Sequence, residues 1–481
     1  MNRKMIFAIL GQITLSEAAL MSLPLLVALI YGEWRVAISF LVAIALALVI
    51  GSLLYFTCKT ENKTIFAKEG FVIVAFAWLI MSAIGALPFV LSGDIPSYVD
   101  AFFETVSGFT TTGASVLLDV ETLSRAGLFW RSFTHWIGGM GVLVFVMALL
   151  PSIADRSIHI MRAEMPGPIV GKIVPRARET ARILYIIYLA MTVIETILLL
   201  AGDMPLYDSI VHAFGTAGTG GFGIKNDSIA SYNPYLQWVI TIFMFLFGIN
   251  FNLYYLIIVN KAKTALKSGE LWAYIGIIAL ATVVICFDIR PLYETLEETI
   301  RASSFQVSSF ITSTGYGTAA YNTWPILSKT VLLFLMFVGA CAGSTGGGFK
   351  VARVVMLVKM VKQELRRITH PRAVTAVKFE DKVLDKTTLS SVSSYLAIYL
   401  VLFIVTLLVI SFEPLGFEAN FTATLSCINN IGPIFSQVDP GVSFAYYTGF
   451  TKIVLSFAML FGRLEIYPLL IALTPSTWTK K

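Results

Sequence analysis

The sequence predicts an all-α, polytopic membrane protein in which two N-terminal transmembrane helices precede four copies of a span–short helix–span unit. Three observations lead to this prediction: the composition, ten apolar stretches, and a glycine-containing motif that occurs four times. Of the 481 residues, 57% are hydrophobic and 13% are charged, and the mean hydropathy is +0.80. Soluble chains carry about 25% charged residues. This chain therefore has too few polar side chains to cover a surface in water.

Ten apolar stretches are each long enough to cross a bilayer, which takes about 20 residues. They lie near residues 6–31, 36–58, 70–92, 127–151, 181–201, 236–259, 272–288, 326–358, 388–411 and 447–473. The first contains Glu17 and lacks a small-residue cleavage pattern, so we interpret it as a span and not as a cleavable signal peptide. The four cysteines lie far apart without a CxxC pair, which predicts neither a disulfide framework nor a zinc site.

The charged residues sort by side of this ten-span arrangement. Lysine and arginine gather before the first span and in alternate connections, at 59–68, 152–182, 261–267, 350–387 and 480–481. The opposite connections are rich in aspartate and glutamate. This pattern follows the positive-inside rule and accounts for the net charge of +6 without a nucleic-acid partner. It predicts that both termini are cytoplasmic.

Four apolar stretches in the outer connections are too short to cross a bilayer and too apolar for a loop in water. They lie at 98–109, 206–217, 296–312 and 418–429. Such segments are typical of re-entrant helices, although a helix packed at the membrane surface has the same composition. The residues that follow them favour the re-entrant interpretation.

A short strand that ends in glycine follows each of these stretches. The four strands are Thr111-Thr112-Gly113, Thr219-Gly220-Gly221, Ser313-Thr314-Gly315 and Asn430-Ile431-Gly432. Their last glycines lie 108, 94 and 117 residues apart, so one unit of roughly 100 residues occurs four times. The repeats divide the chain into a two-helix N-terminal part (1–69) and four pore repeats at 70–155, 156–270, 271–387 and 388–481.

The second and third strands continue as Gly-Phe-Gly and Gly-Tyr-Gly and resemble the TVGYG filter loop of potassium channels. A dehydrated K⁺ needs rings of backbone carbonyls in place of its water shell. Glycine permits the backbone angles that aim successive carbonyls at one axis. The C-terminal ends of the short helices would direct negative dipole ends toward the same axis. The four strands therefore predict a cation pore with K⁺ at the filter carbonyls.

Two other glycine-rich segments look like nucleotide-binding motifs. Residues 218–223 match GxGxxG, but an apolar helix precedes them where the motif requires a strand. Residues 343–350 look like a phosphate loop, but Phe349 breaks its GK[ST] ending and the segment lies within an apolar span. Neither segment is predicted to bind a nucleotide. The four histidines are scattered and form no catalytic constellation, which indicates that the protein is not an enzyme.

These features resemble the Trk/Ktr/HKT superfamily of cation transporters, and within it the bacterial Trk-type potassium uptake membrane subunits. The resemblance extends over nearly the whole chain and also rests on residues 163–168 (AEMPGP), 342–348 (AGSTGGG) and 462–465 (GRLE). It implies that the four repeats surround one pore and that Gly113 in the first strand favours K⁺ over Na⁺. The fourth strand departs most from the TVGYG pattern.

The resemblance also implies how the protein is assembled and located. It implies a homodimer in which each subunit keeps its own pore, and a cytosolic ring of nucleotide-binding KTN/RCK (TrkA-like) subunits as the regulatory partner. It further implies that the protein is surrounded by membrane lipids in the bacterial cytoplasmic (inner) membrane. The transported ion would be K⁺, and this chain would bind no cofactor.

The second span of the third repeat is interrupted by a glycine-rich segment, which consists of Gly343, Ser344, Thr345, Gly346, Gly347 and Gly348. Each glycine within a helix costs about 1 kcal/mol relative to alanine, so no regular helix is expected there. A broken helix at membrane depth must be buried in protein or line water. The segment is either a packing kink or, as the resemblance implies, a gating loop beneath the filter.

Arg463 lies well inside the last span, where a charge costs ~2.5–3.5 kcal/mol on insertion scales and usually faces the interior or a pore. It is either a structural bridge to Glu465 or Glu17 or, as the resemblance implies, a positive barrier in the permeation path. We interpret Arg131 and His135, in the fourth span, as a structural network.

The sequence thus predicts potassium uptake through a gated, K⁺-selective pore. One alternative is a Na⁺-coupled or less selective transporter of the same superfamily. An unrelated secondary transporter is a further alternative, against which the parallel, fourfold repeat argues. The residue pattern is compatible with passive transport and with coupling to H⁺ or Na⁺.

Overall fold

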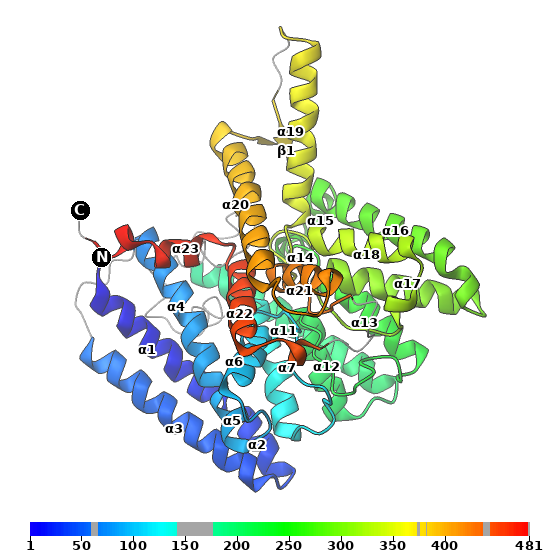
Figure 1. Cartoon of the computed structure of the whole chain (residues 1–481). Helices are drawn as coiled ribbons and strands as arrows, with labels where there is room; N and C mark the ends of the chain where they lie inside the picture. Colours follow the sequence, from blue (N-terminus) through cyan, green and yellow to red (C-terminus); the bar gives the residue numbers. More distant parts are fainter. Residues whose placement is uncertain (59–65, 142–176, 373–375, 381, 436–442, 480–481) are drawn as a thin grey trace.

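The computed structural model describes residues 1–58, 66–141, 177–372, 376–380, 382–435 and 443–479. Within these ranges the chain is almost entirely helical, with one two-residue antiparallel hairpin of β1 (Lys378–Phe379) and β2 (Lys382–Val383). The helices gather into one bundle, from which the distal part of α19 (Val351–Thr369) projects (Figure 1). The predicted motif at 163–168 lies outside the described residues.

Two N-terminal helical spans lie at one side of the bundle. The first consists of α1 (Arg3–Leu20) and α2 (Ser22–Ile30), and the second is α3 (Trp34–Thr57). A Cβ on Gly11 would lie 2.7 Å from the Gly51 carbonyl oxygen, so the two glycines let α1 and α3 approach closely. The exposed side chains of α3 are largely apolar, as expected for a surface in lipid.

Each repeat begins with a continuous apolar span. In chain order these are α4 (Ala67–Gly85) with α5 (Leu87–Ser92), α11 (Ala177–Ala201), α16 (Gly269–Ile289) and α20 (Lys386–Ile410). Together with the two N-terminal spans they make six helices, within the described residues, that are long and apolar enough to cross a membrane. They match six of the ten predicted spans, and the chain is an integral membrane protein.

The four short helices lie where the sequence predicts them. They are α6 (Tyr98–Phe109), α12 (Leu206–Gly218), α17 (Leu296–Ile311) and α21 (Phe417–Asn429). Local signals fix two of the starts, because the side chains of Ser97 and Thr295 cap the first turns of α6 and α17. All four helices end at one of the four glycine strands, and most of their residues are buried.

The second helix is broken in the second, third and fourth repeats, whereas the sequence predicts a break only in the third. The segments are α7 (Arg125–Gly139), then α13 (Pro234–Phe247) with α14 (Phe251–Ile258), α18 (Ile326–Val338) with α19, and α22 (Gly449–Arg463) with α23 (Tyr467–Leu473). The segments predicted as spans at 236–259 and 447–473 each contain a break that the sequence does not predict. Of the span predicted at 127–151, only residues up to 141 are described.

Tertiary contacts explain the two unexpected breaks. α13 and α14 meet at an angle of 89°, and the carbonyl of Gly248 at their junction accepts a hydrogen bond from Cys341 of the third repeat at 3.1 Å. In the fourth repeat Glu465 and Ile466 have positive φ angles of 53° and 68°. The local sequence of neither segment contains a proline or glycine cluster that would announce the break.

The repeats close into a ring. The second helix of each repeat packs against the short helix of the next: α7 on α12, α13 on α17, α18 on α21, and α22 on α6. Among the described residues the remaining short elements are α15 (Ala262–Ala265) and the 3-10 turns Arg290–Leu292, Tyr321–Thr323, Phe444–Tyr446 and Pro475–Thr477. The ring brings the four glycine strands together in the interior.

Candidate selectivity filter and the constriction beneath it

The four glycine strands share one pattern of backbone hydrogen bonds. In each strand the middle residue donates its amide hydrogen to a carbonyl five positions back in the short helix, at 2.9–3.0 Å. The pairs are Thr112 with Ser107, Gly220 with Gly215, Thr314 with Ser309, and Ile431 with Ser426. The fourth strand follows the others despite its divergent residues, because the pattern uses backbone atoms alone.

The backbone angles of the strands also repeat. The first residue of each strand has φ between 54° and 57°, and the closing glycine has φ between 71° and 98°, whereas the middle residue is not at positive φ. This alternation turns successive carbonyls toward the same side of the strand. Non-glycine residues hold the first position, whereas only glycine adopts the angles of the closing position without steric cost, and all four strands end in glycine.

The closing glycines show that the strands lie against one another in a closed order. A Cβ placed on each of them would overlap a carbonyl oxygen of the next strand: Gly113 that of Gly220, Gly221 that of Thr314, Gly315 that of Ile431, and Gly432 that of Thr112. The order runs from repeat 1 to 2, 3, 4 and back to 1. Four equivalent carbonyls therefore surround one axis.

Side-chain hydroxyl groups form further hydrogen bonds at the strands. The hydroxyls of Thr110 and Thr112 are 2.8 Å apart, and those of Thr312 and Thr314 are also 2.8 Å apart. In the fourth strand, where a threonine pair is missing, the Asn430 amide donates to the Thr112 hydroxyl at 3.0 Å. This asparagine joins the last strand to the first.

Arg131 and His135 form the structural network that the sequence predicts. Arg131 pairs with the buried carboxylate of Glu104 at 2.7 Å and donates to the Gly223 carbonyl at 3.3 Å. His135 Nδ1 lies 2.8 Å from the Gly108 carbonyl oxygen. These contacts tie the first strand to the second, because Glu104 and Gly108 belong to the first repeat and Gly223 to the second.

The segment 343–348 lies directly beneath the strands. The amide of Gly347 donates to the Ser313 hydroxyl at 2.5 Å, and the amide of Gly348 donates to the Asn429 carbonyl at 2.9 Å. Ser313 is the first residue of the third strand, and Asn429 ends the fourth short helix. The segment therefore contacts the inner ends of the third strand and of the fourth short helix.

The same segment fills the break in the second repeat. The Gly343 carbonyl accepts from the Phe251 amide at 3.0 Å, and the Thr345 hydroxyl donates to the Phe247 carbonyl at 3.2 Å. The break between α13 and α14 thus supplies partners that an unbroken helix would use internally. The segment therefore contacts the second, third and fourth repeats.

Arg463 contacts the segment from the opposite side. Its guanidinium donates to the Thr345 carbonyl at 2.9 Å and to the Gly139 carbonyl at 2.6 Å, and it also bonds the Gly138 carbonyl. Glu465, one of the two bridge partners that the sequence leaves open, pairs with Arg353. Arg463 thus joins repeats 1, 3 and 4 below the strands.

Three functional candidates were not predicted from the sequence. Lys350 is 2% exposed and donates to the Gly346 carbonyl, which closes the segment on itself. Arg353 is 4% exposed and pairs with Glu465. Glu270 at the start of α16 accepts the Ala342 amide at 2.6 Å. The sequence signal for these three residues is that each is charged and lies next to an apolar span. Their bonding partners are too distant in the sequence to be inferred from it.

Comparison with known proteins agrees with this architecture. The TrkH family, described as cation transport proteins, matches residues 37–288 and 293–480. The Trk system potassium uptake protein TrkH of Salmonella typhimurium is 36% identical over 99% of this chain and all of that protein. The Trk system potassium uptake protein TrkG of Escherichia coli K12 is 34% identical over 95% of this chain and 94% of that protein.

A solved structure has the same fold. The crystal structure of the potassium transporter TrkH from Vibrio parahaemolyticus superimposes with a TM-score of 0.90 and 31% sequence identity, and the match covers all of both chains. A family match over most of the sequence and a full-length structural match lead to one assignment. The chain belongs to the TrkH family of cation transport proteins.

Proposed function

We propose that the protein takes up K⁺ across the bacterial cytoplasmic membrane through a gated pore whose filter is the ring of four strands. The observation that carries the proposal is the closed order of the strand carbonyls, in which each closing glycine abuts the carbonyl of the next strand. Such a ring replaces the water shell of a dehydrated cation. The names of the relatives, which are potassium uptake proteins, support K⁺ as the ion.

The filter residues in this proposal are those that the sequence predicts. They are Thr111, Thr112, Gly113, Thr219, Gly220, Gly221, Ser313, Thr314, Gly315, Asn430, Ile431 and Gly432. Residues 343–348 form the gating loop, and Arg463 is the pore barrier. In this proposal a cation that leaves the filter inward meets a loop bonded to the third strand and the fourth short helix, and a guanidinium bonded to the loop, and these groups together close the path.

The assembly and location follow as parts of the proposal. We expect a homodimer with one pore per subunit, pore repeats at 70–155, 156–270, 271–387 and 388–481 after the N-terminal part at 1–69, and both termini in the cytoplasm. A Trk system implies a further component, and the nucleotide-binding regulatory ring is the expected one. Reversal potentials in a reconstituted bilayer, with K⁺ and then H⁺ or Na⁺ gradients, distinguish passive from coupled transport.

Replacing Gly113 with serine is expected to lower K⁺ selectivity over Na⁺ without abolishing flux. The added Cβ would overlap the carbonyl of Gly220. Because that neighbour is itself a glycine, its peptide can adjust more readily than a bulkier residue would allow. Bi-ionic potentials of the purified variant measure the change, and potentials equal to those of the wild type would contradict the filter assignment.

Replacing Arg463 with alanine is expected to raise cation flux. The change removes a positive charge and frees the carbonyls of Thr345 and Gly139, which relaxes the closed path. Rb⁺ uptake into liposomes measures the flux, and Arg463→Lys, which keeps the charge, is the matched control with wild-type-like flux. A lower flux of Arg463→Ala in well-folded protein would show that Arg463 is only a structural bridge.

A further inference from the structure

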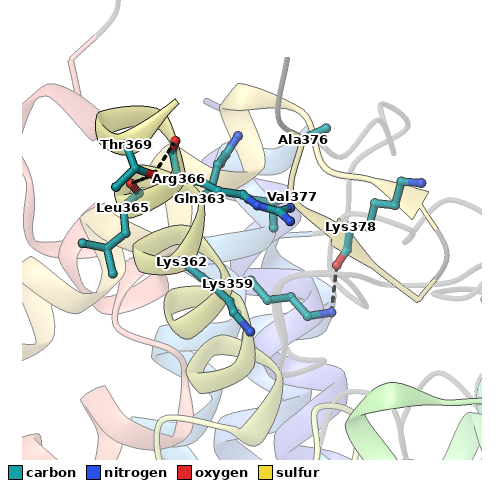
Figure 2. Close-up of a pocket in the computed structure, with 9 residues that line it drawn as sticks. All are labelled: Lys359, Lys362, Gln363, Leu365, Arg366, Thr369, Ala376, Val377 and Lys378. Atoms are coloured by element: carbon teal, nitrogen blue, oxygen red, sulfur yellow. Dashed lines mark hydrogen bonds between the residues drawn. The ribbon is translucent and has the colours of Figure 1, made fainter. Parts of the chain in front are cut away.

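A basic pocket lies between the projecting part of α19 and the segment before β1. Its volume is about 620 Å³, and its lining contains four cationic residues and no acidic one. The lining residues are Lys359, Lys362, Gln363, Leu365, Arg366, Thr369, Ala376, Val377 and Lys378. Figure 2 shows Lys359 and Arg366 reaching from α19 toward the strand segment that carries Val377 and Lys378.

The pocket concentrates positive charge. In the part of the chain that the structure describes, none of the four pocket cations forms an ion pair, whereas the neighbouring Arg367, outside the pocket, pairs with Glu364 at 3.1 Å. The Lys359 ammonium donates to the Lys378 carbonyl at 2.9 Å, which holds the two walls together. Phosphate oxygens are the partners that such clusters of lysine and arginine favour.

An apolar stripe runs along α19 next to these cations. Val358, Val361, Leu365 and Ile368 recur at helical spacing and are each about 60–70% exposed. A soluble phosphate compound would use the charges and leave the stripe in water. A phospholipid uses both, since its headgroup carries the phosphate and its acyl chains are apolar.

The position of the pocket also suits a lipid. The β1–β2 hairpin leads directly into α20, whose apolar span begins at Lys386. Figure 1 shows β1 beside α19 at this end of α20. The pocket therefore lies near the end of a membrane span, which is where phospholipid headgroups are found. We propose that it binds the phosphate headgroup of an anionic phospholipid, with an acyl chain along the stripe.

The pocket is connected to the glycine-rich loop through both of its walls. Two residues separate the end of the loop at Gly348 from the start of α19 at Val351. On the other wall, Glu380 of the hairpin accepts from the Ser268 hydroxyl at 2.9 Å and the Glu270 amide at 3.2 Å, and Glu270 in turn holds the Ala342 amide. A bound lipid would fix the walls relative to each other and thereby bias the loop; this part rests on the proposed gating function.

Lipid binding is tested on the purified, full-length protein without any flux measurement. Native mass spectrometry compares the binding of phosphatidylglycerol with that of phosphatidylcholine in the wild type and in a Lys362→Gln/Arg366→Gln double variant. Each cation near the membrane surface contributes about 1 kcal/mol, so the double variant is expected to bind phosphatidylglycerol at least ~10-fold more weakly. Arg367→Gln, which removes a charge of the same helix outside the pocket, is the matched control and should bind as the wild type does.

Several outcomes would overturn the proposal. Equal affinity for the two lipids, or an equal loss in Arg367→Gln, would show that the pocket is not a specific site. If inorganic pyrophosphate binds the wild type in phosphatidylcholine nanodiscs as tightly as phosphatidylglycerol does, the pocket is a site for a soluble phosphate compound. Unchanged lipid binding in the double variant, with loss of copurification of a cytosolic partner, would identify a protein-docking surface.

The link to the loop has a separate test. In liposomes, raising the phosphatidylglycerol fraction is expected to change the Rb⁺ flux of the wild type by several-fold. Glu380→Ala should keep lipid binding but remove this dependence, because it breaks the contact of the hairpin with α16. If Glu380→Ala responds to lipid as the wild type does, the coupling is refuted while lipid binding and K⁺ transport both stand.

Discussion

Alanine in place of Gly221 is expected to abolish K⁺-selective flux. Gly221 has a φ of 71°, an angle at which a residue with a Cβ is destabilised by about 1–2 kcal/mol. The new Cβ would also overlap the Thr314 carbonyl of the neighbouring strand. Since Thr314 is not a glycine, its peptide cannot rotate away cheaply, and the carbonyl must leave the ring. The ring then lacks a partner for the dehydrated ion, and we expect the K⁺ flux to fall by at least ~10-fold, which corresponds to about 1.4 kcal/mol.

Gly276 provides the matched control. It lies in α16, and no atom lies within 4 Å of a Cβ placed on it. Gly276→Ala should therefore conduct and select as the wild type does. ⁸⁶Rb⁺ uptake in competition with Na⁺ measures both properties in proteoliposomes. Wild-type selectivity in a correctly folded Gly221→Ala variant would mean that the strand does not contact the permeating ion.

Deletion of residues 343–348 is expected to produce a high K⁺ flux that no longer depends on a cytosolic partner or nucleotide. The deletion removes the amide groups of Gly347 and Gly348 that contact the inner ends of the third strand and the fourth short helix. It also removes the carbonyl of Thr345 that binds Arg463. The path below the filter then has no plug. Rb⁺ uptake with and without partner and nucleotide measures the effect.

A point variant keeps this prediction testable if the deletion disturbs folding. Lys350→Met retains the length and apolar stem of the side chain but removes the ammonium that binds the Gly346 carbonyl. It should raise flux in the same direction, by less than the deletion does. Ser344→Ala, which removes only a hydrogen bond to the nearby Cys341 carbonyl, is the control. A deletion variant that still requires the partner in order to conduct would rule out this loop as the gate.

The regular helices were the part of the fold that the sequence predicted well. An apolar stretch of sufficient length must form its backbone hydrogen bonds internally in a membrane, so composition alone located the six continuous spans. The short helices were found because they are apolar and end in a repeated glycine strand. The Ser97 and Thr295 caps fix two of their starts.

The breaks in the second helices were harder to predict because two of them depend on tertiary partners. The break in the third repeat has its cause in the local glycines. The bend at Gly248 instead uses a hydrogen bond from Cys341, which is 93 residues away in the sequence. The turn at Glu465 and Ile466 directs the Glu465 carboxylate to Arg353 in another repeat. No local pattern encodes these contacts.

The fourth strand is the opposite case, because its sequence diverges while its backbone geometry is the same as in the other strands. Its side chains depart from the glycine-threonine pattern, which made its carbonyl geometry doubtful by sequence. The structure shows the same backbone bonds and angles as in the other strands, because those depend on the short helix and on Gly432. The asparagine at position 430 substitutes for a threonine pair by binding Thr112 directly. A divergent sequence thus preserves the ring by a different side-chain contact.

The most direct test of the account is to locate the bound ion. Crystals of the protein grown with Rb⁺ or Tl⁺ give anomalous density that marks the cation independently of any functional assay. The proposed filter predicts peaks on the common axis of the four strands, coordinated by the carbonyls of Thr112, Gly220, Thr314 and Ile431. Anomalous density located only away from this axis, with the strands in the geometry described, would contradict the claim that the four strands form the selectivity filter.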